Sequence, residues 1–166
     1  KELRSFSETG LVIEGGEDPL FVWEEVVEVG NLLNQIGIKQ VTGNLIITNK
    51  FYMNFEANPV AAGNFLKQAL NSQNWPREAA IQYQTLPPGT PRPQVVINGS
   101  VQFSPATPKN LQTLIKHSSF PLAELVKKMN QYSNNLMADM LANAVGGPQI
   151  VAQKAAKIKF KRPPKS

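Results

Sequence analysis

The stretch Met129–Leu141, MNQYSNNLMADML, decides how the second half of the chain is expected to fold. It places the polar triplet Ser133, Asn134 and Asn135 between two segments with helical periodicity. Serine and asparagine side chains accept hydrogen bonds from the first N–H groups of a helix. The triplet is therefore predicted to join two amphipathic helices. Their apolar residues recur at spacings of three and four: Leu122, Leu125, Val126 and Met129, then Leu136, Met140, Leu141 and Val145.

Working outward from the triplet, the helical region is expected to begin after Ser119, a possible helix cap. The glycine pair at 146–147 suits a helix end, because glycine readily adopts a positive φ. Pro148 then opens a third helix. The sequence thus predicts a helical subdomain over 119–158, followed by a basic, disordered tail over 159–166.

Residues 1–118 carry alternating helix and strand signals and are predicted to form a mixed α/β region, with helices packed on a β-sheet. The fold class is therefore α+β. Helices are expected from Trp23 toward Gly37 and from Asn58 to Leu70, the second entered through Pro59. Strands are expected within Leu3–Glu14 and over Ile38–Thr48, the second with a bend at Gly43. Residues 81–85 and 94–99 are expected to form a hairpin, which Val101–Phe103 continues. A last strand is expected over Leu111–His117.

The formal net charge of +5 is concentrated at the C-terminal end. Six of the 17 basic residues lie from Lys154 onward with no acid among them, so the rest of the chain carries 11 − 12 = −1. No aromatic platform or recognised nucleic-acid motif accompanies these charges, and no nucleic-acid partner is expected. The apolar runs are far shorter than the ~20 residues that span a bilayer, so no membrane span is expected either. No signal peptide is expected within these residues, and they include no cysteine.

His117 is the only histidine, so a histidine-based metal site or a Ser-His-Asp triad would depend on it alone. We expect it to be a surface residue at the end of a strand, and we predict no metal and no cofactor. Lys127 and Lys128 precede the triplet on its first helix and are expected to form a solvated face.

Several stretches together resemble one family. They are GGEDP at Gly15–Pro19, IKQVTGNLIITNKFY at Ile38–Tyr52, and FPLAELVKKMNQYSNN at 120–135. These resemble the serine D-alanyl-D-alanine peptidases, the penicillin-binding proteins. The particular similarity is to the carboxypeptidase/endopeptidase branch, which has an inserted domain between its SxxK and SxN motifs. YSNN would be the SxN motif.

The resemblance implies a segment of a β-lactamase/transpeptidase-like fold. It implies catalytic roles for Ser133 and Asn135: the serine would relay a proton toward the leaving group, and the amide would orient the substrate and the active-site lysine. Asn134 would mainly build the junction. It also implies peptidoglycan stem peptides or β-lactams as ligands of the complete enzyme, no cofactor, and a periplasmic or extracytoplasmic location.

The other two motifs of that family are missing from the sequence. No serine is followed by a lysine three positions later, and the nearest match to KTG is VTG at 41–43, ahead of SxN instead of after it. Two hypotheses follow. The chain is either a segment of a cell-wall D-alanyl-D-alanine carboxypeptidase/endopeptidase, inactive alone, or a stand-alone noncatalytic binding or structural protein derived from that fold.

Overall fold

The computed structural model describes residues 10–132 and 135–156 of the 166-residue chain. The expected disordered tail over 159–166 lies outside the described residues. The chain divides into two compact units, unit 1 (Lys1–Phe120) and unit 2 (Pro121–Ser166). No helix in the described ranges combines the length and the apolar composition needed to cross a membrane.

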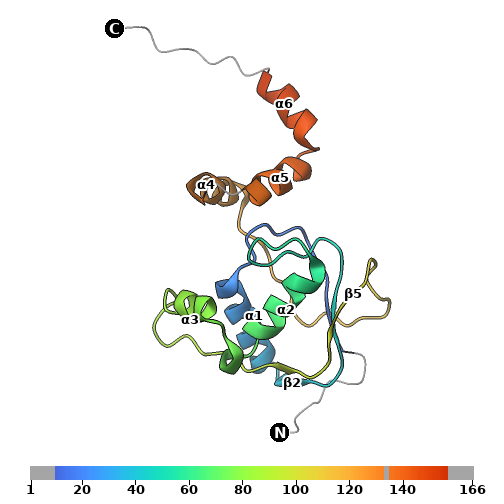
Figure 1. Ribbon diagram of the computed structural model, residues 1–166, viewed down its shortest axis with the longest axis vertical. Helices are drawn as coiled ribbons and strands as arrows, with labels where there is room; N and C mark the ends of the chain where they lie inside the picture. The colour runs from blue at the N-terminus through green and yellow to red at the C-terminus, as the bar shows by residue number, and fades with distance from the viewer. Residues whose placement is uncertain (1–9, 133–134, 157–166) are drawn as a thin grey trace. The chain divides into compact units, whose positions relative to one another are not determined.

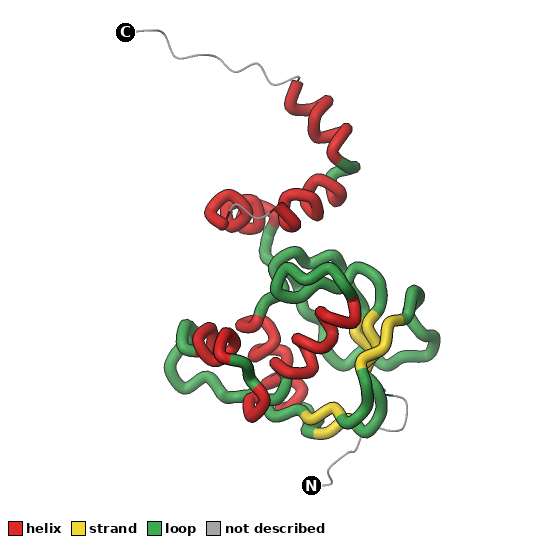
Figure 2. The backbone as a smooth tube through the Cα atoms, viewed as in Figure 1, coloured by secondary structure: helices red, strands yellow, loops and turns green. Residues whose placement is uncertain are grey.

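In its described part, residues 10–120, unit 1 contains short strands, three α-helices and long loops (Figure 2). Helix α2 packs on strands β3 and β5, helix α1 packs on α2, and α3 packs on α1. The core lies where these layers meet, and Val26, Leu45, Ile47 and Leu66 are almost completely buried there. The bounds are β1 Leu11–Ile13, α1 Trp23–Gln35, β2 Gln40–Val41, β3 Leu45–Ile47, α2 Pro59–Ala69, the 3-10 turn η1 Ser72–Asn74, α3 Arg77–Tyr83, β4 Val96–Ile97 and β5 Val101–Phe103.

All the strand pairs between these named strands are parallel. One sheet has the order β1-β3-β5 and the other pairs β2 with β4. Gln40 is opposite Val96 and Leu45 is opposite Val101, so the sequence offset between the partners is the same in both pairs. The strand expected over Ile38–Thr48 therefore forms as two short strands that follow one partner segment in constant register.

The break between these two strands coincides with the predicted bend at Gly43. Its carbonyl accepts a hydrogen bond from the N–H of Gly99 at 3.1 Å, and the Asn44 side chain accepts one from the N–H of Ser100 at 2.9 Å. A Cβ atom on Gly99 would lie 2.4 Å from the Gly43 oxygen. Because residue 99 is glycine, the segment that contains β4 and β5 can stay close to the segment that contains β2 and β3 where both pass from one sheet to the other.

The predicted helices α1 and α2 are confirmed. Asn58 caps α2 by accepting a hydrogen bond from the N–H of Ala61 at 3.0 Å, and Pro59 occupies the first turn. Near the C-terminal end of α1, the Asn34 side chain accepts a hydrogen bond from the N–H of Gln94 at 2.8 Å and donates one to its C=O at 3.0 Å. This pair of bonds fixes the approach of the chain to β4.

Two predicted β segments are wrong. Residues 81–85 lie in and just after helix α3 and do not form a hairpin, because the helix-favouring residues from Arg77 begin a helix after Pro76 and bury Ala79 on one face. Residues 94–99 contribute β4, which pairs with β2 instead. Leu111–His117 has no regular structure, although Leu114 and Ile115 pack against the core. Its alternating pattern reflects individual apolar contacts.

The described residues of unit 2 form three helices, α4 Leu122–Tyr132, α5 Asn135–Ala144 and α6 Pro148–Ala156. The carbonyl of Pro121 accepts from the N–H groups of Glu124 and Leu125, so the helix starts later than a Ser119 cap requires. Gly146 and Gly147 have φ values of +109° and +94°, and the N–H of Gly147 reaches back to the carbonyl of Ala142 at 2.8 Å. This is a Schellman-type end, as predicted.

Candidate functional site

The sequence-predicted site lies at the junction between α4 and α5. Helix α4 ends at Tyr132 and α5 begins at Asn135, whose side chain is exposed. Ser133 and Asn134 lie outside the described residues. In Figure 1 α4 is seen nearly end-on while α5 runs across the view, so the two are not one straight helix. The two helices predicted on either side of the triplet are confirmed, and the catalytic roles of Ser133 and Asn135 stay a prediction.

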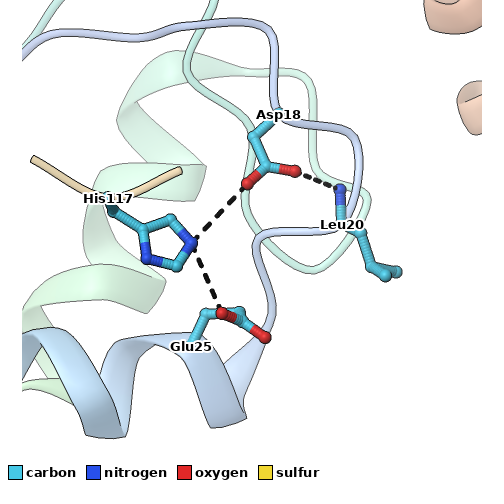
Figure 3. Close-up of polar contacts among 4 residues, drawn as sticks. All are labelled: Asp18, Leu20, Glu25 and His117. Atoms are coloured by element: carbon cyan, nitrogen blue, oxygen red, sulfur yellow. Dashed lines mark hydrogen bonds and ion pairs between the residues drawn. The ribbon is translucent and has the colours of Figure 1, made fainter. Parts of the chain in front are cut away.

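Unit 1 contains a second polar cluster, which the sequence did not predict. Figure 3 shows the imidazole of His117 directed at two carboxylates, those of Asp18 and Glu25. Its Nε2 atom lies 3.3 Å from Glu25 Oε2 and 3.7 Å from Asp18 Oδ2. Only 23% of the His117 side chain is exposed, so the expectation of a surface residue at a strand end is wrong. We call Asp18, Glu25 and His117 the His117 cluster.

Backbone packing of the GGEDP segment places Asp18 in this cluster. A Cβ atom on Gly15 would lie 2.3 Å from the carbonyl carbon of Lys50, so only glycine permits this approach. The N–H of Gly15 donates to Thr48 Oγ1 at 3.0 Å. Asp18 Oδ1 in turn accepts from the N–H of Leu20 at 2.9 Å, which forms a turn around Pro19 and leaves Oδ2 directed at His117.

Burial determines the electrostatics of the two acids. Desolvation raises the pKa of the Asp18 carboxyl, opposed by the hydrogen bond from Leu20 and the charge interaction with His117. Desolvation also raises the pKa of Glu25, which His117 lowers and the neighbouring acids raise further. For both carboxyls, the effect of burial on the pKa is larger than the opposing effect of His117.

The cluster does not form a Ser-His-Asp triad within the described residues, since no serine hydroxyl there bonds to His117. The sequence shows the single histidine and the GGEDP stretch, but nothing in it brings them together. The available signal was the pair of acids, Glu24 and Glu25, in the first turn of α1.

Comparisons with known proteins agree with the resemblance found in the sequence. The D-Ala-D-Ala carboxypeptidase 3 (S13) family model matches residues 92–159, which include the Ser133–Asn135 triplet. No curated protein matches the chain.

Two solved structures of Bd3459, a predatory endopeptidase from Bdellovibrio bacteriovorus, share the fold. A variant form matches with a TM-score of 0.57 and 23% identity, over 90% of this chain and 41% of that one. A penicillin G-acylated form in complex with the immunity protein Bd3460 matches with a TM-score of 0.58 and 23% identity, over 90% of this chain and 40% of that one. The chain thus spans about two-fifths of the length of these proteins. The resemblance found in the sequence is therefore confirmed: residues 92–159 match the model of the S13 D-Ala-D-Ala carboxypeptidase family, and the chain shares the mixed α/β fold of the Bd3459 endopeptidase.

Proposed function

We propose that this chain supplies the SxN-bearing part of a serine D-alanyl-D-alanine carboxypeptidase/endopeptidase acting in peptidoglycan maturation. The observation that supports this most strongly is the junction between α4 and α5. Within the residues matched by the family model, two helices meet at a Ser-Asn-Asn triplet. A periplasmic or other extracytoplasmic location belongs to the same proposal.

The proposal gives the junction a chemical role. Ser133 relays a proton toward the leaving group, and the Asn135 amide orients the substrate and the lysine of the SxxK motif. Asn135 is exposed and is the first residue of α5, which leaves its amide accessible to a ligand. The first N–H groups of a helix also lack intrahelical partners and can donate to a bound peptide.

Residues 1–166 contain no SxxK serine, so Ser133 has no acyl acceptor beside it within this sequence. We therefore propose that the chain is inactive alone and that peptide stems or β-lactams bind in the complete enzyme, where SxxK and KTG complete the cleft.

Labelling with a fluorescent penicillin tests both parts of this proposal. The chain of 166 residues and the product of the complete reading frame that encodes it are incubated with the reagent, denatured and compared on a gel. We expect a stoichiometric adduct only on a product that contains SxxK and KTG. An adduct on the shorter chain contradicts its inactivity. No adduct on a folded, longer product with both motifs contradicts the peptidase function.

The alternative is a stand-alone noncatalytic binding or structural protein. It is favoured by the core of unit 1, in which the side chains of β3 and α2, such as Ile47 and Leu66, are almost fully buried. A reading frame with neither SxxK nor KTG would select this alternative.

A further inference from the structure

The His117 cluster brings together potential metal ligands from three separate parts of the chain. Asp18 lies in the loop before α1, Glu25 lies on α1, and His117 belongs to the irregular segment after β5 (Figure 3). Glu28 is one turn further along α1 and has a carboxylate oxygen close by. The ligand atoms of Glu25, Glu28 and His117 all lie within 4.8 Å of one another.

The spacing of these atoms suits a shared cation better than direct hydrogen bonds. The Nε2 to Oδ2 distance to Asp18 is 3.7 Å, and the distance to Glu25 Oε2 is 3.3 Å. Hydrogen bonds of this type are usually about 2.7 to 3.2 Å long. In a tetrahedral site with metal–ligand bonds of about 2.0 to 2.2 Å, neighbouring ligand atoms are about 3.4 Å apart. Both measured distances lie close to that value.

The charge balance points in the same direction. Among the described residues of unit 1, no lysine or arginine forms an ion pair with Asp18, Glu25 or Glu28. A single imidazole supplies at most one positive charge against three carboxylates. A divalent cation would supply the remaining positive charge.

The cluster is also held in position before any ligand binds. The His117 ring packs edge-on against Phe21, with centroids 5.3 Å apart, and Phe21 packs in the same way against Phe51. The Leu20 N–H holds one oxygen of Asp18 and leaves the other directed at His117. Glu28 is exposed, so one side of the cluster is open to water and to an entering ion.

We propose that His117, Glu25 and Glu28 bind one Zn²⁺ ion that holds the segment after β5 against helix α1, with Asp18 beside the imidazole. An imidazole nitrogen with carboxylate oxygens is a suitable ligand set for zinc, whereas Ca²⁺ and Mg²⁺ prefer oxygen ligands alone. The ion has a structural role and takes no part in the chemistry proposed for the SxN junction.

The sequence makes this proposal simple to test. The chain contains one histidine and no cysteine, so His117 is the only nitrogen or sulfur side-chain ligand of the usual zinc type. Zinc chloride is titrated by calorimetry into the 166-residue chain without a histidine tag, and the imidazole resonances are followed by NMR. The variants are His117→Gln and Glu25→Gln. The control is Glu17→Gln, since Glu17 lies in the same loop but pairs with Lys50 at 2.9 Å outside the cluster.

We expect one zinc ion per chain, a shift of the His117 imidazole resonances with zinc and none with magnesium, and unchanged affinity in Glu17→Gln. Loss of an outer-shell partner typically weakens metal binding by about 10- to 100-fold, so loss of a direct ligand in His117→Gln should weaken it by at least about tenfold. If His117→Gln does not fold, the zinc affinity of Glu25→Gln and the NMR titration of the unaltered chain still test whether the cluster binds zinc. Absence of saturable binding, or binding that leaves the imidazole resonances in place, overturns the proposal.

Discussion

Replacing Gly63 by alanine tests how closely helix α2 packs on the three-stranded sheet. A Cβ atom at this position would lie 2.5 Å from Val101 Cγ1 and 2.6 Å from Ile47 Cγ1. Ile47 is completely buried, so it has little room to move. The added methyl group therefore has two opposite effects on stability: alanine favours the helix more than glycine does, but its Cβ atom overfills the contact with the sheet.

The magnitudes decide the sign. Alanine is favoured over glycine within a helix by about 1 kcal/mol. Overpacking a core typically costs about 1 to 3 kcal/mol, and two contacts this short belong in the upper half of that range. We therefore expect Gly63→Ala to lower the free energy of unfolding by about 1 to 2 kcal/mol, the reverse of its effect in an isolated helix.

Urea unfolding followed by tryptophan fluorescence measures this change, because both tryptophans, Trp23 and Trp75, lie in unit 1. Asn64 is exposed and is the next residue in α2, so comparing Asn64→Ala with Asn64→Gly measures the helix preference alone. That pair should favour alanine by about 1 kcal/mol. If Gly63→Ala is also stabilising by that amount, the close contact between α2 and the sheet is wrong.

Three further predictions concern side chains at other positions. Asn34→Ala removes the two hydrogen bonds to Gln94 that fix the approach to β4, and it should lower the free energy of unfolding by about 2 kcal/mol in the same urea assay. The control Asn31→Ala loses one exposed bond and should cost at most about 1 kcal/mol. Equal costs would contradict this. In metal-free buffer, Asp18→Asn keeps the turn acceptor and loses a half-buried charge, so its melting temperature should exceed that of Asp18→Ala; the opposite order would refute the turn. In a complete enzyme, Ser133→Ala should slow acylation by a chromogenic β-lactam by roughly 10²- to 10⁴-fold, while Asn134→Ala should change it little. Similar rates for Ser133→Ala and the unaltered enzyme would leave only a capping role.

Sequence patterns predicted the features that depend on near neighbours. The spacing of apolar residues located α1, α2, α4, α5 and α6, and Asn58 with Pro59 located the start of α2. Helix α3 was missed because it is short, and IQYQT alternates as a strand does. The parallel pairing of β2 with β4 was missed because a strand carries no local mark of a partner that lies two helices further along the chain.

The candidate sites divide in the same way. The junction at Ser133–Asn135 was predictable because the helices on either side are adjacent in sequence. The position of Asp18 within a glycine-rich turn was visible, but its neighbour His117 lies in a segment without regular structure. Only the packing of that segment against Phe21 and α1 brings the imidazole to the carboxylates.

The central position of β3 has a consequence for synthesis of the chain on the ribosome. Strand β3 pairs with β1, which is made before it, and with β5, which is made only after α2, α3 and β4. A nascent chain that ends before Val101 exposes one edge of β3, together with the face of α2 that β5 covers. Unit 1 is therefore expected to complete folding only after β5 has left the exit tunnel. Until then, the exposed edge of β3 is a binding site for chaperones and a starting point for aggregation.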